Sequence, residues 1–529
     1  MWKKTNGTNT EPVEKPEDNI NTSTPSDQDP YGIMKPLSPV LTENINRLKD
    51  IFKYDKSVIY RCFGNRHTES FHACIVFVSN MADHKDINEN LIAPILQSDL
   101  RDVPKDEMID YLKTKVIPSM DMKETEYMDS VLQSLFEGDT VLFVDGEDKA
   151  LVIRSTDYAE RQITEPEFEK VLEGPREGFV ENLSVNLTLI RRRLKSPELK
   201  FKFKEVGTRT RTTICLCYLE NLVNERVLNE LENRIDKIDI DSVVGANVIA
   251  ENIVDSPLSV FSTVGSTERP DVTVSKILEG RIAILVDGSS KVLTMPFVFI
   301  ESFQTAEDYY TEYHFASLNR ILRITSAAIS IAAPSVYLAL VTFHQEMIPT
   351  PLLLSISAAR QGVPFPTIVE MLLLLFAFDL VREASARISS QMGQSITIVG
   401  ALILGQAAVD ARFFSSLIVI IVAITGTTGI MTPKLKGAYI IIRTLLLMLT
   451  AVMGIYGLCY GTFVLFLHLF SLRSLGVPFM MGLGSVKPDE IKDTVIRTPW
   501  WFMNTRSKLV SGIASRRQSM DSRKGKMMS

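Results

Sequence analysis

The chain has 529 residues, and its 57 Lys and Arg against 63 Asp and Glu give a net charge of −6, which does not indicate nucleic-acid binding. A chain of this length holds roughly three or four folding units. Its five cysteines are an odd number without zinc-type spacing, so we expect reduced, packed thiols and no metal site.

The N-terminal segment is polar and rich in Thr, Asn, Pro, Glu and Asp. Such a composition cannot bury enough apolar surface to offset its ordering entropy, so we expect residues 1–41 to form a disordered arm. The segment also lacks the apolar core of a signal peptide. We therefore expect the soluble region that follows it to stay in the cytoplasm.

An internal repeat divides the soluble half. The segment Glu137–Leu151 reads EGDTVLFVDGEDKAL and Glu279–Leu293 reads EGRIAILVDGSSKVL, with seven of fifteen positions identical at an offset of 142. Each reads as a strand, an Asp-Gly turn and a second strand. Two apolar runs, Ala73–Asn80 and Ile214–Asn221, repeat at an offset of 141, which argues against a chance match.

These matches predict two related α/β subdomains, residues 42–175 and 176–305. The charged, proline-containing segment Tyr158–Gly178 between them suits a linker. We interpret the aspartates of the two repeats, Asp145 and Asp287, as turn residues, because neither has the spaced ligand set that calcium requires.

Three arginines end a predicted helix over Phe179–Leu194. Arg191, Arg192 and Arg193 would lie at its C-terminus, where the helix dipole favours cations. Two interpretations stay open: a solvated cap, or a contact with another subunit or with lipid headgroups.

A 20-residue apolar stretch without charge, Ile324–Phe343, begins the second half of the chain. A helix of that length rises about 30 Å, the thickness of a bilayer's hydrocarbon core. Further apolar segments follow at Leu352–Ala359, Ile368–Val381, Ile396–Val409, Leu417–Met431 and Ala438–Phe470.

The lengths of these segments predict a broken-up helical membrane domain over residues 306–490. Leu352–Ala359 is too short to cross and suggests a re-entrant helix. Ala438–Phe470 exceeds one crossing, so it is either a hairpin turning near Gly454–Gly461 or one protruding helix. Residues 491–529 form a basic tail. With both ends cytoplasmic, the number of crossings is even, and we favour six over four.

Embedded carboxylates single out a candidate pore. Glu370, Asp379 and Asp410 lie in or at the ends of apolar pieces, where a charge costs several kcal/mol unless it faces partners or water. One carboxylate per subunit in a symmetric ring would favour cations. Val363 and Phe365, in the turn QGVPFP, would form a hydrophobic constriction that closes by dewetting.

The gate of such a pore needs a two-state element. The paired subdomains reach the first span through Glu307–Arg323, so this segment is the natural lever. We therefore take Arg323 as a candidate coupling residue, together with the three arginines of the helix in the second subdomain.

Long ungapped motifs resemble the A-subunit of spore germinant receptors, the GerA family. They include GPREGFVENLSVNLTLIRRRLKSPELKF, TFHQEMIPTPLLLSISAARQGVPFPTIVEMLL, GQSITIVGALILGQAAVDA and HLFSLRSLGVPF. The resemblance covers about Ser57 to Arg506. After Ile424 the chain departs from the pattern, because TGTTGIMTP replaces a more apolar stretch, and its threonines would change a helix end or a pore lining.

The resemblance implies an α/β cytoplasmic region of two related subdomains and an α-helical multi-span domain in the spore inner membrane. The partners it implies are a multi-span B-subunit and a lipoprotein C-subunit, in a receptor for small nutrients. It also implies a homo-oligomeric ring that releases monovalent cations when nutrient is sensed.

Three other functions compete with a channel. A secondary transporter would also use broken helices and buried charges, and a non-conducting scaffold would need none of the carboxylates. We do not expect an enzyme, a catalytic residue or a cofactor, since the sequence contains no phosphate loop, nucleophile elbow or metal cluster. The basic tail would either bind membrane lipids or only set the topology.

Overall fold

The computed structural model describes residues 34–68, 70–101, 103–104, 107–117, 121–155, 166, 169–171, 173–387, 405–483, 493–503, 506 and 510–511. These residues divide into two compact units. Unit 1 takes its described residues from 1–53, 60–77 and 83–155, and unit 2 takes them from 54–59, 78–82 and 156–529.

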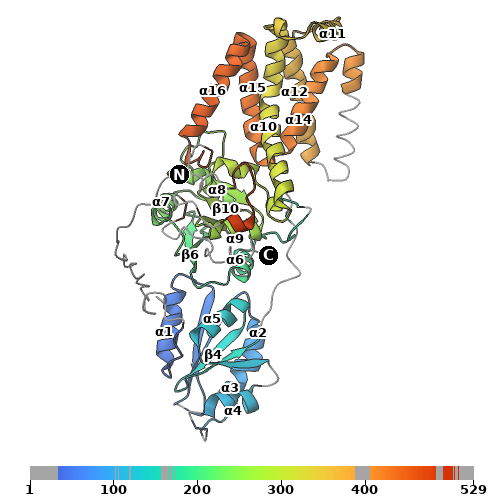
Figure 1. Ribbon diagram of the computed structural model, residues 1–529. Coiled ribbons are helices and arrows are strands. Elements are labelled where there is room, and N and C mark those ends of the chain that lie inside the picture. The colour runs from blue at the N-terminus through green and yellow to red at the C-terminus, as the bar shows by residue number, and fades with distance from the viewer. Residues whose placement is uncertain are drawn as a thin grey trace, which may run out of the picture. The chain divides into compact units, whose positions relative to one another are not determined.

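The first α/β subdomain is a five-stranded sheet in the order β1-β2-β4-β5-β3 with helices packed against it (Figure 1). The pairs β2–β4, β4–β5 and β5–β3 are antiparallel. Its elements are α1 (Leu41–Ile51), β1 (Val58–Gly64), β2 (His72–Val78), α2 (His84–Asp86), η2 (Ile87–Ile92), α3 (Ala93–Gln97), α4 (Met108–Tyr111), η4 (Leu112–Val116), β3 (Met122–Thr125), α5 (Met128–Glu137), β4 (Thr140–Val144) and β5 (Ala150–Ile153).

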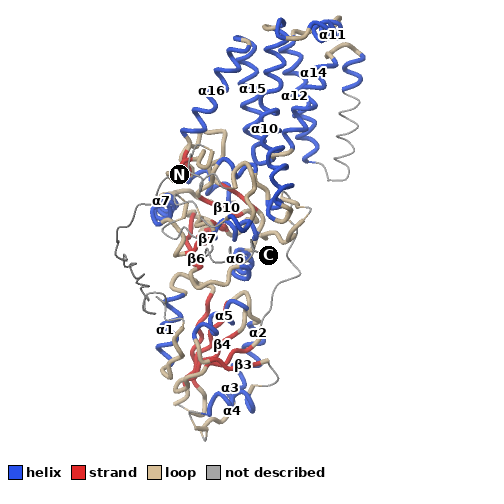
Figure 2. Tube along the Cα trace, viewed as in Figure 1, coloured by secondary structure: helices blue, strands red, loops and turns tan. Residues whose placement is uncertain are grey.

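The second subdomain, in unit 2, repeats this plan with the strand order β6-β7-β9-β10-β8 (Figure 2). Its elements are α6 (Leu183–Arg193), β6 (Leu199–Val206), β7 (Thr212–Leu219), α7 (Glu225–Asp236), α8 (Ala246–Ile253), β8 (Gly265–Thr267), α9 (Pro270–Leu278), β9 (Ile282–Val286) and β10 (Val292–Met295).

Helices cover both faces of this second sheet, so successive residues of β7 are apolar and pack into opposite cores. Ile214 and Leu216 join the core that contains α7 and α8, whereas Cys215 and Cys217 point to the opposite core with α6 and α9. The two thiols lie 3.8 Å apart and are fully buried, so they share a face. Cys74 is also free and buried, whereas Cys62 and Cys459 are free but exposed, so the prediction of packed thiols is wrong for these two.

The same hydrogen bonds recur in the two subdomains. The amide of Leu41, at the start of α1, donates to Asp145 Oδ1 at 3.2 Å, and that of Leu183, at the start of α6, donates to Asp287 Oδ1 at 3.3 Å. Both hairpins predicted from the repeat are therefore present. Their connecting loops are longer than a two-residue turn, because each aspartate reaches across to cap a helix.

A buried asparagine repeats in the same way. Asn44 exchanges two hydrogen bonds with the backbone of Ser38, at 2.7 and 3.0 Å. Asn186 does so with the backbone of Val180, at 2.6 and 2.9 Å. In both subdomains this pair of bonds fixes the chain just before the first helix.

The C-terminal half of unit 2 is a helical bundle (Figure 1). Short 3-10 turns, η6 (Phe299–Phe303) and η7 (Ala306–Tyr309), lead into it. Its helices are α10 (Tyr313–Thr342), α11 (Thr350–Arg360), α12 (Thr367–Arg387), α14 (Ser416–Ile430), α15 (Lys436–Met453) and α16 (Ile455–Ser471), with the turns η8 (Gln345–Met347) and η9 (Pro433–Leu435) between them.

The long apolar segment 438–470 forms a hairpin, which confirms one of the two predicted alternatives. Gly454 separates α15 from α16 with φ 61° and ψ −138°. A Cβ at this position would lie 2.9 Å from the ring of Phe343, so glycine is required both by the backbone conformation and by the close approach. Figure 1 shows α11 lying across the end of the bundle rather than along it.

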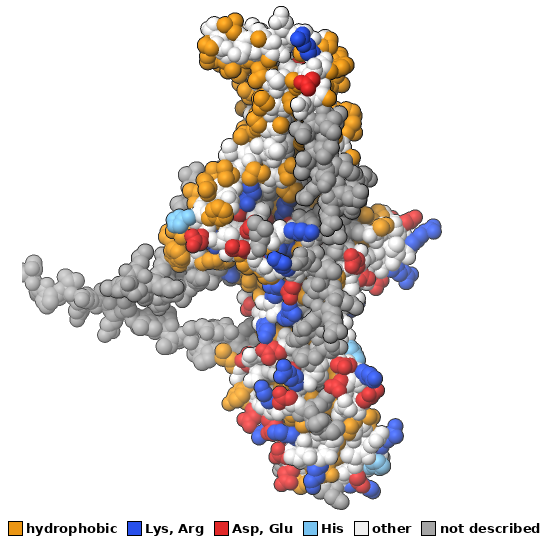
Figure 3. Space-filling view, turned by 90° about the vertical axis from the view of Figure 1, so that its right-hand side faces the viewer, with side chains coloured by type: hydrophobic (Ala, Val, Ile, Leu, Met, Phe, Trp, Pro, Cys, Tyr) orange, Lys and Arg blue, Asp and Glu red, His pale blue; other side chains and the backbone are white. Residues whose placement is uncertain are grey.

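Two helices of the described residues are long and apolar enough to cross a membrane, Tyr313–Thr342 and Pro433–Met453. The apolar helices Ser416–Ile430 and Ile455–Ser471 are shorter. On the face in Figure 3, hydrophobic side chains dominate the helical end and charged ones the α/β parts. The number of crossings stays a prediction, and most of the expected segment Ile396–Val409 lies outside the described residues.

Packed residues occur inside both terminal segments, the predicted N-terminal arm and the predicted basic tail. Leu37 is buried, and its amide donates to the carbonyl of Glu126 at 2.8 Å, so the packed part begins before residue 42. At the other end, Ser511 forms an isolated bridge with Val223 of the second subdomain. The first part of the basic tail therefore folds back onto unit 2.

We predict that Asn44→Ala and Asn186→Ala destabilise α1 and α6 to a similar extent. Each change removes two hydrogen bonds from a buried side chain to partly buried backbone groups, which costs about 1–3 kcal/mol. Hydrogen–deuterium exchange of the detergent-solubilised chain would show faster exchange in the helix concerned. The exposed Asn247 is the control, and Asn247→Ala should change protection little. Equal protection in all three variants would contradict the prediction.

Candidate pore and coupling sites

A buried network of charges holds the base of α10. Arg320 is fully buried, and its Nε and Nη1 donate to Asp308 Oδ2 at 3.2 Å and Asp493 Oδ1 at 2.9 Å. Arg323 donates from Nη2 to Asp308 Oδ2 at 2.6 Å and from Nε to the carbonyl of Phe303 at 2.8 Å. Asp308 thus lies between two guanidinium groups and is only 2% exposed.

The network joins three parts of unit 2: η7, the first turns of α10, and the segment around Asp493. Tyr309 closes it by donating its hydroxyl to Asp493 Oδ2 at 2.6 Å, and burial raises the pKa of Tyr309 well above its ordinary value. The predicted coupling residue Arg323 therefore sits inside the predicted lever. Sequence reasoning missed Asp308, Arg320 and Asp493.

A second cluster lies where the second sheet meets η6. Glu301 is buried and forms ion pairs with Arg281 and with Lys276, whose Nζ lies 2.9 Å from Glu301 Oε2. Burial alone would raise the pKa of Glu301, but the charges of Arg281 and Lys276 outweigh it, so this pKa is lowered. The carboxylate is therefore ionised and ties α9 and β9 to the segment leading to α10.

A cavity of about 640 Å³ adjoins this junction. Its wall includes Val274 of α9, Tyr309 of η7, Arg323 of α10, Pro433 after α14 and Trp500 near the C-terminus. Because five separate segments meet around unfilled space, the junction can change shape at lower cost than a densely packed core.

Of the three arginines of α6, Arg191 is buried and is therefore not a solvated cap. Arg191 is 3% exposed, pairs with Asp55, donates to Ser57 Oγ at 3.1 Å and lies 4.8 Å from the ring centroid of Phe201. Arg192 and Arg193 both pair with Glu177. Arg191 is thus enclosed within unit 2, whereas Arg192 and Arg193 keep partial exposure, so an intersubunit or lipid contact stays a prediction for these two.

Glu370 is the most enclosed of the predicted pore residues. It lies in the first turn of α12, is fully buried, and accepts a hydrogen bond through Oε1 from the amide of Ser415, just before α14. Its Oε2 is buried without a hydrogen-bond partner among the described residues. The helix dipole of α14 stabilises the charge, but the described residues place no cation in ion-pair contact with it.

The two other carboxylates differ in their surroundings. Asp379 pairs with Arg382 at 2.8 Å and with Arg443 at 2.6 Å, so its charge is compensated within the chain. Asp410 is exposed at the end of a helical stretch. The three predicted pore carboxylates share no hydrogen-bond or ion-pair partner among the described residues, and their joint role stays a prediction.

The predicted constriction forms a tight turn between α11 and α12. Val363 and Phe365 are half-buried there, and the amide of Val363 donates to the carbonyl of Arg360 at 3.2 Å. Gly362 has φ +90°, and a Cβ there would lie 3.0 Å from Arg412. This turn is thus fixed by glycine, and its role as a gate stays a prediction.

The threonines after Ile424, where the chain departs from the family pattern, form hydrogen bonds within α14. Thr425, Thr427 and Thr428 each donate their hydroxyl to a carbonyl one turn earlier in α14, at 2.7 Å. Their polarity is therefore satisfied inside the helix. Only Thr427 of the three is exposed.

These features define a membrane-associated protein with a large duplicated α/β region and a helical bundle that contains isolated charges. A sequence model of the Bacillus/Clostridium GerA spore germination protein family matches residues 46–509, and the chain belongs to this family.

Relatives of similar length agree. The chain is 39% identical over 489 residues to spore germination protein KA of Bacillus subtilis (strain 168), covering 92% of this chain and 90% of that protein. It is 32% identical over 440 residues to spore germination protein GerLA of Bacillus cereus, covering 83% and 89%. The crystal structure of the N-terminal domain of the A subunit of the Bacillus megaterium spore germinant receptor GerK3 overlaps 50% of this chain and 98% of that chain, at 26% identity and a TM-score of 0.41.

We predict that Asp308→Asn strongly destabilises unit 2. The change removes the acidic partner of Arg323 and one of the two acidic partners of the buried Arg320, which costs about 3–5 kcal/mol. Thermal unfolding of the detergent-solubilised chain would show the loss. The neighbouring Glu307→Gln is the matched control, with an expected change within about 0.5 kcal/mol. If both variants unfold like the wild type, the network does not hold the base of α10.

The lowered pKa of Glu301 predicts an acid-sensitive junction. The ionised carboxylate stabilises the folded state above its unfolded pKa of about 4.5, and this contribution is lost as the pH falls through the lower, folded pKa. Proteolysis of the 296–312 segment should therefore accelerate below about pH 4.5 in the wild type. Glu301→Gln should raise the rate at neutral pH and flatten this acid dependence, whereas the exposed Glu251→Gln should change neither.

Proposed function

We propose that this chain is the A-subunit of a nutrient receptor in the spore inner membrane and that its helical region forms a homo-oligomeric cation channel. Membership of a spore germination family and two candidate spans support the general role. The channel activity, the oligomer and the B- and C-subunit partners belong to the proposal.

The proposed channel rests on one observation, that Glu370 is buried and has no cationic partner among the described residues. A buried carboxylate without a cationic partner in an apolar bundle is costly unless water or an ion reaches it. In a ring, one such group per subunit would attract potassium or sodium and repel anions. Asp410 adds an exposed charge, while Asp379, held by two arginines, should contribute less.

We infer the orientation in the membrane from the basic residues near the base of α10. The α/β subdomain of unit 2 lies at the end of α10 that carries the buried Arg320, and Lys434 and Lys436 lie just before and at the start of α15. Basic residues favour the cytoplasmic side, so we place the α/β region and the C-terminal tail there. A nutrient signal from a partner subunit would change the equilibrium of the lever at the base of α10. The chain is not proposed to be an enzyme.

The carboxylate ring predicts a change in selectivity. In liposomes containing the reconstituted chain, Glu370→Gln should lower the permeability ratio of potassium to chloride several-fold, and adding Asp410→Asn should lower it further. Asp379→Asn is the matched control, because loss of its ion pairs should lower thermal stability more than selectivity.

Two outcomes would count against the proposal. An unchanged permeability ratio when all three carboxylates are neutralised would contradict the proposed carboxylate ring. Flux of a substrate at fixed stoichiometry without ionic current would favour the transporter, and the absence of any flux, with or without partner subunits, would favour the scaffold.

A further inference from the structure

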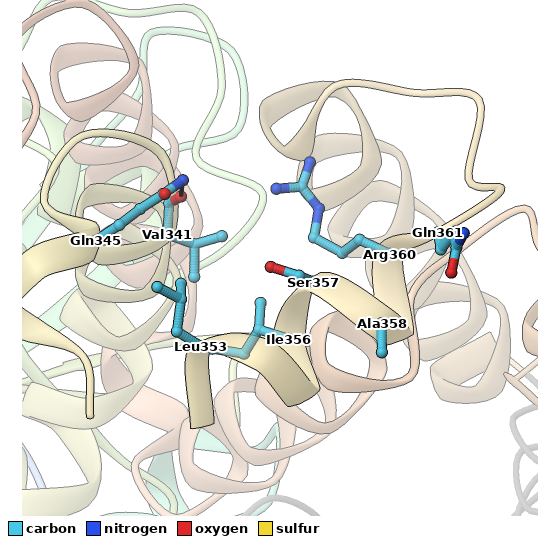
Figure 4. Close-up of a pocket in the computed structure, with 8 residues that line it drawn as sticks. All are labelled: Val341, Gln345, Leu353, Ile356, Ser357, Ala358, Arg360 and Gln361. Atoms are coloured by element: carbon cyan, nitrogen blue, oxygen red, sulfur yellow. Dashed lines mark hydrogen bonds between the residues drawn. The ribbon is translucent and has the colours of Figure 1, made fainter. Parts of the chain in front are cut away.

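A pocket of about 520 Å³ opens between α11 and the end of α10 (Figure 4). It lies at the end of the bundle that is distant from the α/β subdomain of unit 2. Its volume falls in the range of about 300–1,000 Å³ that is typical of small-molecule sites. The lining residues are Val341, Gln345, Leu353, Ile356, Ser357, Ala358, Arg360 and Gln361.

One face of α11 supplies most of the wall. Leu353, Ile356, Ser357 and Arg360 follow the spacing i, i+3, i+4, i+7, so they lie on a single stripe. Figure 4 shows these four side chains directed toward the end of α10, while Ala358 points away. Leucine, isoleucine and valine side chains thus form an apolar floor beside one cation and one hydroxyl.

Arg360 has no charge partner in the described part of the chain. Its Nε is buried without a hydrogen bond, and no carboxylate there lies within ion-pair distance. Every other buried arginine named above has at least one acidic partner. A half-buried guanidinium offers a planar fork of donors that fits a carboxylate in two parallel hydrogen bonds.

Glu370 is not an ion-pair partner of Arg360 in the described part of the chain. Glu370 accepts a hydrogen bond from the amide of Ser415 through Oε1 and does not line the pocket. The amide nitrogen of Gln345 is also engaged, by the carbonyl of Val341 at 2.9 Å.

We propose that this pocket binds a small carboxylate with a short apolar body, such as an aliphatic organic acid or an aliphatic amino acid. The carboxylate pairs with Arg360, Ser357 donates a further hydrogen bond, and the aliphatic part packs on Leu353 and Ile356. The phosphate of an anionic lipid headgroup is the other source of a matching anion. The volume and short apolar floor favour the small molecule.

This site goes beyond the proposed function, and its occupancy does not require ion conduction. If the bundle crosses the membrane with its α/β region in the cytoplasm, the pocket opens on the opposite face, where external solutes arrive. Its position next to the turn that contains Val363 gives a bound ligand a short physical path to the predicted constriction.

The test measures binding rather than flux. The full chain in nanodiscs of neutral lipid is titrated with isovalerate and with its neutral analogue isovaleramide, and binding is followed by saturation-transfer NMR. A charged hydrogen-bonded pair should make isovalerate bind about ten-fold or more tightly than the amide. Arg360→Gln should abolish this preference, whereas Arg412→Gln, which changes an exposed arginine outside the pocket, should preserve it.

Further variants separate the alternatives. Leu353→Trp fills the pocket and should weaken both probes together, while Arg360→Lys should retain part of the preference for isovalerate. Equal binding of the two probes by the wild type would overturn the proposal. So would an Arg360-dependent competition by anionic lipid that excludes isovalerate completely, because the site would then belong to a headgroup.

Discussion

The placement of Asp308 between Arg320 and Arg323 is the contact on which the organisation of unit 2 depends. A charge removed from water is tolerated only when another charge or a set of hydrogen bonds replaces the lost hydration. At the base of α10 this requirement joins the end of the α/β region, the first apolar helix and the returning C-terminal segment. No residue of this network can move far unless its partners move as well.

The same constraint gives meaning to the charges that lack such compensation. Asp379 forms ion pairs with two arginines, and Glu301 forms ion pairs with an arginine and a lysine. We therefore interpret these two carboxylates as structural. Glu370 and Arg360 have no ion-pair partner among the described residues. Charges of this kind persist where an ion, a ligand or another subunit supplies what the chain itself does not.

Local pattern predicted much of the fold. The repeated Asp-Gly segments predicted both hairpins, the two continuous apolar runs predicted buried strands, and the uncharged stretch at Ile324–Phe343 predicted α10. The hairpin at Gly454 was one of two alternatives, since apolar length alone does not place a turn.

The sequence did not predict which side chains pair with each other, because the partners lie far apart along the chain. Asp145 caps a helix 104 residues away, and Arg320 meets Asp493 at a separation of 173 residues. Carboxylates were recognisable as embedded, but only the fold distinguishes the paired Asp379 from the unpaired Glu370. The pocket at Arg360 was missed for the same reason, although the stripe on α11 at i, i+3, i+4, i+7 was a readable signal.

The central claim is that the helical bundle surrounds a path for cations. Its most direct test is the current carried by the wild-type chain in a planar bilayer under a gradient of potassium chloride. We expect discrete conductance with a reversal potential displaced toward the potassium equilibrium value. A bilayer that contains the folded protein, with and without its partner subunits, and carries no current would contradict it.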